Sequence, residues 1–151
     1  MIEQIAPGMI LILGSLLLLF LRGTLAKSVA LALPIISAAH MHMFPADTVI
    51  TATIFDFNLV ITQVDSLSLV WGYIFHIAAL ISVIYQLHVK GNLQDLSGLM
   101  YAGAAICAVF ARDLISLFIF WELTAITSVF LIYARRTERS AKVGTRYLII
   151  Q

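Results

Sequence analysis

The sequence predicts an all-α membrane protein with about five transmembrane helices and a short β-hairpin between the second and third helices. Of the 151 residues, 62% are hydrophobic and only 11% are charged. Soluble domains have roughly 45 to 50% apolar and about 25% charged residues. The apolar residues gather in segments close to the roughly 20 residues that a helix needs to cross a hydrocarbon core. The net charge of +1 gives no reason to expect nucleic acid as a partner.

Five apolar segments give the expected helices, and the whole chain, 1–151, is expected to form one transmembrane domain. The segments are 5–21, 25–44, 67–89, 96–111 and 114–134. The first is not interpreted as a signal peptide, because it lacks a basic start and another apolar segment follows at once. After the fifth segment, the tail VGTRYLIIQ resembles the start of a sixth helix.

The connection between the second and third segments is the longest in the chain. Residues 47–64 read DTVITATIFDFNLVITQV, with Asp56 and Asn58 at a polar centre. Because β-branched and aromatic residues surround this centre, the pattern favours a two-stranded hairpin outside the lipid.

The basic residues indicate an orientation in the cell membrane. Most of them follow the first, third and fifth apolar segments: Arg22, Lys27, Lys90, Arg135, Arg136, Arg139, Lys142 and Arg146. On the opposite side, the connection 47–64 has none and Arg112 is the only basic residue. Because cytoplasmic loops are enriched in Lys and Arg, we expect an extracytoplasmic N-terminus and cytoplasmic residues 135–146.

Glu122 lies near the middle of the fifth segment, DLISLFIFWELTAITSVFLIY. A charged side chain at mid-membrane costs roughly 2.5 to 3.5 kcal/mol on insertion scales, so Glu122 is a candidate for proton transfer. A cation that approached the carboxylate would favour its ionised form, and one that moved away would favour proton uptake. The alternative is a protonated Glu that hydrogen-bonds a neighbouring helix and has only a packing role.

Three further residues are weaker candidates for a proton pathway through the membrane. His76, near the middle of the third segment, could relay protons because imidazole titrates near neutral pH. Thr124 and Ser128 could line a hydrated path beside Glu122. Each of the three could instead join neighbouring helices by a hydrogen bond.

Two aspartates precede apolar segments. Asp65, in VDSLSL, is expected to cap the third helix. Asp113 and its neighbour Arg112 either anchor the helix at the membrane interface or lie at the outer mouth of an ion path.

The sequence predicts no metal site, no cofactor and no catalytic residue of an enzyme. Cys107 is the only cysteine, which excludes an intrachain disulfide and a cysteine-based metal site. A haem-bearing redox subunit is another alternative. Two histidines that ligate one haem must lie at the same depth in the membrane, and the four histidines here do not form such a pair. These histidines are His40, His42, His76 and His88.

The segment 101–131, with its run DLISLFIFWEL, resembles the antiporter-like subunits shared by respiratory complex I and Mrp-type multisubunit cation/proton antiporters. The VDSLSL start of the third segment, after an outer hairpin, is similar to the same family. The tail TRYLIIQ most resembles the Mrp D-type subunits. The resemblance covers essentially the whole chain, as the N-terminal part of such a subunit.

This resemblance implies a subunit that translocates protons in exchange for a cation, with sodium as the expected cation, in a prokaryotic cytoplasmic membrane. It implies that Glu122 pairs with a lysine in the continuation of the subunit, and that the other partners are membrane subunits, protons, a monovalent cation and the bilayer. We therefore expect a transporter subunit rather than an enzyme, and a redox-driven proton-pumping complex stays open. The alternative is a non-transporting scaffold that stabilises partner subunits.

Overall fold

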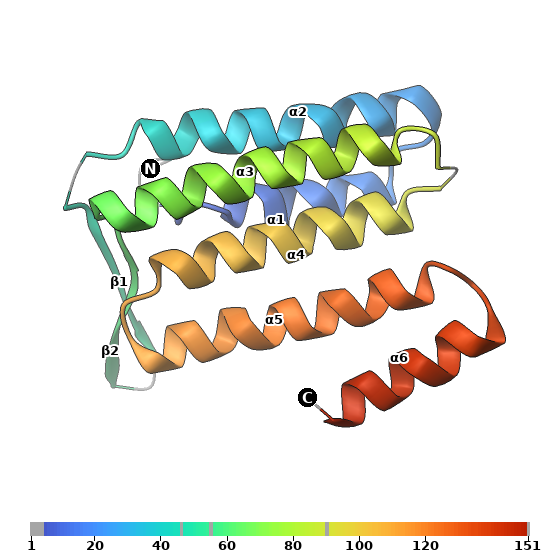
Figure 1. The fold of residues 1–151 in the computed structure, drawn as a ribbon. Coiled ribbons are helices and arrows are strands. Elements are labelled where there is room, and N and C mark those ends of the chain that lie inside the picture. The colour runs from blue at the N-terminus through green and yellow to red at the C-terminus, as the bar shows by residue number, and fades with distance from the viewer. Residues whose placement is uncertain (1–4, 46, 55, 90, 151) are drawn as a thin grey trace.

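The computed structural model describes residues 5–45, 47–54, 56–89 and 91–150. Its helices lie side by side, with a β-hairpin across one end (Figure 1). Four helices are long and apolar enough to cross a membrane: α2 (Gly23–His42), α3 (Ser66–Gln86), α4 (Leu93–Phe110) and α5 (Leu114–Tyr133). Each matches an expected segment to within a few residues. The prediction of a mostly helical chain with apolar segments of membrane-spanning length is confirmed for these four.

The first apolar segment forms a shorter helix than 5–21. Helix α1 covers Met9–Leu16 and one tighter turn, η2, continues it over Leu17–Leu19. At 1.5 Å per residue this element is roughly 16 Å long, about half of the roughly 30 Å hydrocarbon core. The first expected segment therefore corresponds to a shorter apolar helix, and the described residues form four helices of sufficient length to cross a membrane.

The reason for the late start of α1 is a close approach between Gly8 and α4. Gly8 has φ = +91°, which lies in the left-handed region that favours glycine. A Cβ atom at Gly8 would lie only 2.5 Å from the Gly103 carbonyl oxygen and 3.0 Å from Cys107 Sγ. Cys107 is fully buried here, and its thiol donates to the Pro7 carbonyl oxygen at 3.1 Å. Pro7 and Gly8 therefore pack against α4 in a non-helical conformation.

Helix α4 is the centre of the bundle. It packs against α1, α3 and α5, and α2 packs against α3. Its side chains Leu99, Ile106 and Phe110 are almost fully buried in the main apolar core. Half of the α4 span is buried, compared with 22% of the α5 span. Helix α5 therefore keeps a broad face turned away from the other helices.

The expected hairpin is present within 47–64. Strands β1 (Val49–Ile54) and β2 (Phe57–Gln63) are antiparallel, with an irregularity in register between Ile50 and Thr51. Asp56, in the turn, has φ = +67°. The Val60 carbonyl accepts a hydrogen bond of 3.2 Å from the Arg112 backbone N–H. This bond joins β2 to the connection between α4 and α5.

The chain after α5 forms α6 (Glu138–Ile150), which turns back along α5 (Figure 1). A sixth helix was expected from the tail VGTRYLIIQ, but it begins five residues earlier and takes in basic residues. Gly144 allows α6 to approach the Tyr133 ring closely. The Tyr133 hydroxyl and Thr145 Oγ1 are 3.2 Å apart.

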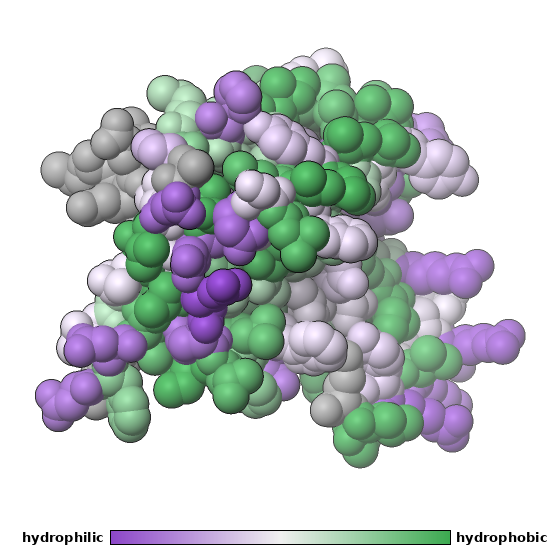
Figure 2. Space-filling model, turned by 60° about the vertical axis from the view of Figure 1, so that its left-hand side comes forward, coloured by the Kyte–Doolittle hydropathy of each residue, from purple (hydrophilic) through white to green (hydrophobic). Residues whose placement is uncertain are grey.

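The bundle has two chemically different ends. The connections α1 to α2, α3 to α4 and α5 to α6 meet at one end, here named the basic end, and the hairpin and the α4 to α5 connection form the hairpin end (Figure 1). Arg22, Arg135 and Arg136 belong to the basic end, whereas Lys90 lies outside the described residues. Figure 2 shows hydrophilic side chains gathered towards the hairpin end and others projecting at the right-hand edge, with apolar surface between them.

Candidate functional site

Glu122 lies near the middle of α5, on the outward face of this helix. Its side chain is half-buried and shares a shallow groove of about 480 Å³ with Leu114, Leu117, Phe118 and Trp121. Phe118 is 62% exposed and Trp121 is 60% exposed. The carboxylate therefore stands on an apolar surface that the described part of this chain does not cover.

No hydrogen bond or ion pair to the Glu122 carboxylate is formed by the residues that the structure describes. An ionised carboxylate without a partner in an apolar environment is costly, and such a group takes up a proton or binds a cation instead. The arrangement around Glu122 therefore leaves the carboxylate oxygens open to a positive group or a hydrogen-bond donor from outside this chain.

The structure does not connect Thr124 and Ser128 with Glu122. The Thr124 hydroxyl donates to the Trp121 carbonyl oxygen at 2.6 Å, and the Ser128 hydroxyl donates to the Ala125 carbonyl oxygen at 2.6 Å. Both hydroxyls thus donate their hydrogen bonds to backbone carbonyl oxygens of their own helix, which is a common arrangement for Ser and Thr in helices.

His76 joins α3 to α2. The side chain is only 3% exposed, with Nδ1 2.7 Å from the Gly72 carbonyl oxygen and Nε2 2.9 Å from Ser37 Oγ. Because the carbonyl can only accept, Nδ1 carries a proton, and a neutral ring then accepts from the Ser37 hydroxyl at Nε2. Both nitrogens are engaged, so this geometry leaves neither available to a haem iron.

Asp65 is the N-cap of α3. Its Oδ1 accepts from the Ser68 backbone N–H at 2.8 Å, and the Asp65 N–H donates to Ser68 Oγ at 3.0 Å, which completes a capping box. Arg112 Nη1 lies 3.6 Å from Asp65 Oδ2. The backbone hydrogen bond from Ser68 is the main cause that lowers the pKa of the Asp65 carboxyl, and Arg112 adds to it.

Asp113 plays the corresponding role at the start of α5. Its carboxylate accepts from the Ser116 backbone N–H and from the Ser116 hydroxyl, both at 2.8 Å. Partial burial acts to raise the pKa of Asp113, but these hydrogen bonds outweigh it and the pKa is lowered. Both aspartates are therefore ionised caps at the hairpin end.

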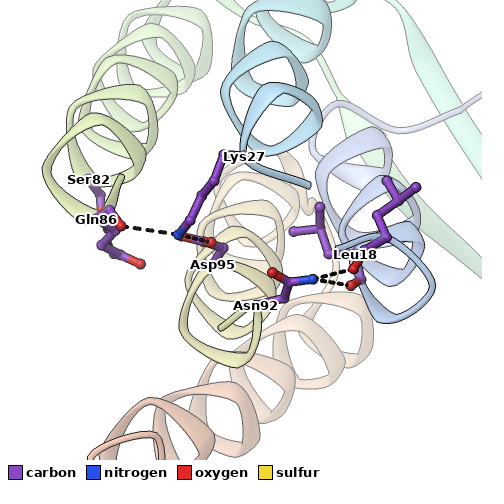
Figure 3. Close-up of polar contacts among 7 residues, drawn as sticks. Leu18, Lys27, Ser82, Gln86, Asn92 and Asp95 are labelled. Atoms are coloured by element: carbon purple, nitrogen blue, oxygen red, sulfur yellow. Dashed lines mark hydrogen bonds and ion pairs between the residues drawn. The ribbon is translucent and has the colours of Figure 1, made fainter. Parts of the chain in front are cut away.

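A buried ion pair at the basic end was not predicted from the sequence. Lys27 Nζ on α2 lies 2.6 Å from Asp95 Oδ2 on α4 and donates to the Gln86 backbone carbonyl oxygen at 3.1 Å (Figure 3). The side chain of Asp95 is 2% exposed and that of Lys27 is 18% exposed. We name these three residues the Lys27–Asp95 cluster. It joins α2, α3 and α4 at one level of the bundle.

Two buried oxygens of the cluster, Asp95 Oδ1 and Gln86 Oε1, have no hydrogen-bond partner among the described residues. The Gln86 amide nitrogen donates to Ser82 Oγ at 2.8 Å. This bond fixes the orientation of the amide, with Oε1 directed away from Ser82. Within the described ranges, no group of three or more His, Cys, Asp or Glu side chains could hold a metal ion.

Asn92 extends the polar contacts of the basic end to α1 (Figure 3). Its Nδ2 donates to the Leu18 carbonyl oxygen at 2.9 Å and to the Leu21 carbonyl oxygen at 2.5 Å. These two carbonyls lie at the end of the first apolar element, where no further helical turn provides donors. Asn92 therefore stabilises the point at which this element ends.

The order of the helices alone indicates that Lys27 and Asp95 lie at the same end of the bundle. The second and fourth segments both begin at the basic end, so a base and an acid near their starts fall at a similar depth. In the sequence, Lys27 counts only among the basic residues that indicate orientation, and the expected fourth segment begins at Leu96, one residue after Asp95. The helix begins at Leu93, which places Asp95 in its first turn.

Comparison with known proteins gives no assignment for this chain: no protein-family model matches it, and no curated protein sequence matches it.

Proposed function

We propose that this protein is a membrane-embedded subunit of a proton-translocating complex that exchanges protons for a monovalent cation, with sodium as the expected cation. In this proposal Glu122 accepts and releases the proton. The observation that carries the proposal is the position of Glu122, half-buried on the outward apolar face of α5 and unpartnered among the described residues. The resemblance of DLISLFIFWEL to antiporter-like subunits supports it.

The chemistry follows from what an apolar surround does to a carboxylate. A carboxylate at mid-membrane is costly to keep charged unless a cation lies beside it. In this proposal Glu122 holds a proton while no cation is near and releases it when a cation arrives. If a Lys or Arg approached along the groove beside Phe118 and Trp121, Glu122 would release its proton. If that cation moved away, Glu122 would take up a proton again. We propose that this cation is carried by a membrane segment other than the described helices, such as one of a partner subunit.

The proposed membrane placement rests on four apolar helices of sufficient length and on the distribution of charge. The basic end, with residues 135–146, would face the cytoplasm according to the positive-inside rule. The hairpin end would face the opposite side, where Asp65 and Asp113 form ionised helix caps.

The test compares two identical chemical changes in membrane vesicles that contain the assembled complex. Glu122→Gln removes the carboxylate at mid-helix, and Glu138→Gln removes an exposed carboxylate on α6. The collapse of a pH gradient on addition of NaCl is followed with a fluorescent amine. We expect Glu122→Gln to slow exchange about a hundredfold or more, within the range of general acid–base contributions. Glu138→Gln should leave the rate unchanged.

Co-purification of the partner subunits must be retained in the Glu122→Gln complex, so that a loss of transport is a loss of chemistry. Full exchange activity in this variant would contradict the proposal. It would favour the second candidate, a non-transporting scaffold. Close packing of Gly72 against Met41 and of Gly103 against Gly8 is the observation that favours a rigid scaffold.

A further inference from the structure

The geometry points to a cation site separate from Glu122. We propose that the Lys27–Asp95 cluster binds Na⁺, and that Na⁺ competes with the Lys27 ammonium for the oxygens of Asp95 and Gln86. The inference rests on the proposed function for the role of this cation in transport. The binding itself does not depend on Glu122 and can be measured without transport.

The first argument is that a cation already occupies the cluster. The Lys27 ammonium is held by Asp95 Oδ2 at 2.6 Å and by the backbone carbonyl oxygen of Gln86 at 3.1 Å (Figure 3). A carboxylate and a carbonyl oxygen are also the ligands that hard metal cations prefer. The position of the ammonium nitrogen is therefore one where a metal ion with the same charge would be stabilised by the same oxygens.

The second argument is that the cluster has more acceptors than Lys27 satisfies. Asp95 Oδ1 and Gln86 Oε1 are both buried without a partner among the described residues. A buried acceptor left without a partner costs free energy, and the cost is greater for a charged group. Neither oxygen can donate, so only a donor or a cation can satisfy them. One cation between Asp95 and Gln86 could use oxygens that the ammonium leaves unused.

The charge of the cluster favours a monovalent over a divalent ion. Asp95 is its one carboxylate, and the described residues contain no group of three or more acidic, His or Cys side chains suited to a metal. A single negative charge balances one positive charge, whether that charge is on the ammonium or on Na⁺. A divalent ion would leave a net positive charge in a site where Asp95 is 2% exposed.

The third argument is that Lys27 has space to leave Asp95. A hollow of about 490 Å³ at the basic end is lined by Lys27 together with Thr24, His88 and Asn92, among others. Lys27 is already 18% exposed, and its four-carbon stem can place the ammonium in water while the helix stays in place. Displacement of Lys27 by Na⁺ therefore requires only a rotation of the side chain. No proton has to be transferred.

The test measures thermal unfolding of the full chain in detergent at fixed pH, with NaCl replaced by choline chloride at constant ionic strength. Lys27→Met removes the competitor and leaves the oxygens of Asp95 and Gln86. A competitor reduces the apparent affinity in proportion to the fraction of sites that it leaves free, and Lys27 holds nearly all of them. In Lys27→Met the Na⁺ concentration for half of the thermal shift should therefore fall about tenfold or more. The double variant Lys27→Met/Asp95→Asn removes both charges and should unfold at one temperature in both salts.

Two further variants distinguish this inference from the proposed function and from a folding defect. Glu122→Gln should keep the wild-type Na⁺ response even if its exchange activity is lost. Gln86→Leu keeps the ion pair and removes Oε1, so it should require more Na⁺ than the wild type. Lys27→Met protein that folds only in NaCl would also support the site.

The inference is overturned if Lys27→Met unfolds at the same temperature in NaCl and choline chloride. If this variant folds in neither salt, the comparison of wild type with Gln86→Leu decides. Equal responses of these two proteins to Na⁺, or no response in either, would overturn the site as well.

Discussion

Lys27 and Asp95 are 68 residues apart in the sequence, yet their charged atoms lie 2.6 Å apart at the basic end of the bundle. This pair links the start of α2 to the start of α4, the central helix. Its burial means that the two charges depend on each other, because water is not available to replace a missing partner.

Removing one member of this pair should cost far more stability than removing both. Loss of one partner of a buried pair costs about 3 to 5 kcal/mol, and we expect about 3 kcal/mol for Lys27→Met because Lys27 is partly exposed. The double variant Lys27→Met/Asp95→Asn should recover most of this loss. Unfolding in detergent with choline chloride as the salt measures the difference. Equal losses in the single and double variants would show that the two charges are not coupled.

Gly103 should tolerate alanine poorly, whereas Gly98 on the same helix should tolerate it well. A Cβ atom at Gly103 would lie 2.8 Å from the Gly8 carbonyl oxygen and 2.9 Å from Leu11 Cβ, so α1 would have to move. We expect a loss of about 1 to 3 kcal/mol from this overpacking. At Gly98 the nearest atom would be 3.8 Å away, so the higher helix propensity of alanine should stabilise the protein by up to about 1 kcal/mol. The thermal midpoints of the two variants provide the measurement.

Asn92→Ala should weaken the attachment of α1 to α4. The substitution removes two hydrogen bonds, to the carbonyl oxygens of Leu18 and Leu21. At about 0.5 to 1.5 kcal/mol for each bond, the expected loss is about 1 to 3 kcal/mol. Asn58→Ala is the matched control, since Asn58 is exposed on the hairpin. Hydrogen exchange should show faster exchange in α1 for the first variant only, and unchanged exchange there would contradict the role of Asn92.

Acid should weaken the hairpin end through Asp65 and Asp113. Both carboxyls have a lowered pKa in the folded protein, chiefly through the Ser68 N–H for Asp65 and, against the opposing effect of burial, the Ser116 hydrogen bonds for Asp113. Their contribution is therefore complete above the ordinary pKa of about 3.9 and is lost as the pH falls through the lower folded values.

The double variant Asp65→Asn/Asp113→Asn tests this pH dependence, because Asn still caps helices without a charge. We expect wild type to lose more stability than this variant when the pH is lowered from 6 to about 3. Parallel stability curves for the two proteins would show that the aspartates do not contribute.

The sequence predicted the four long helices and the hairpin because these depend on local patterns. The β-branched residues on both sides of Asp56 correctly indicated two strands. Four expected segments differ from the observed helices by only a few residues: 25–44, 67–89, 96–111 and 114–134. The helix within 5–21 is shorter than expected for a non-local reason. Hydropathy continues through Pro7 and Gly8, but contact with Gly103 holds this part of the chain out of the helix.

The candidate site was predicted less completely. Glu122 stands out in the sequence because a carboxylate within an apolar helix is rare and costly. The Lys27–Asp95 cluster does not, since each of its charges lies near the end of an apolar segment and resembles an interfacial residue. Only the packing of α2 and α4 in the same direction shows that these two charges meet.

The burial of Cys107 gives the protein a practical property for labelling experiments. The only thiol of the sequence is fully enclosed between α1 and α4 and donates to the Pro7 carbonyl oxygen, so a water-soluble maleimide has no access to it in the folded protein. A cysteine introduced at exposed Asn58 or Glu138 would be the single reactive position in each variant. Modification of intact cells by an impermeant reagent would then report directly which end of the bundle faces outward, with the native cysteine left in place.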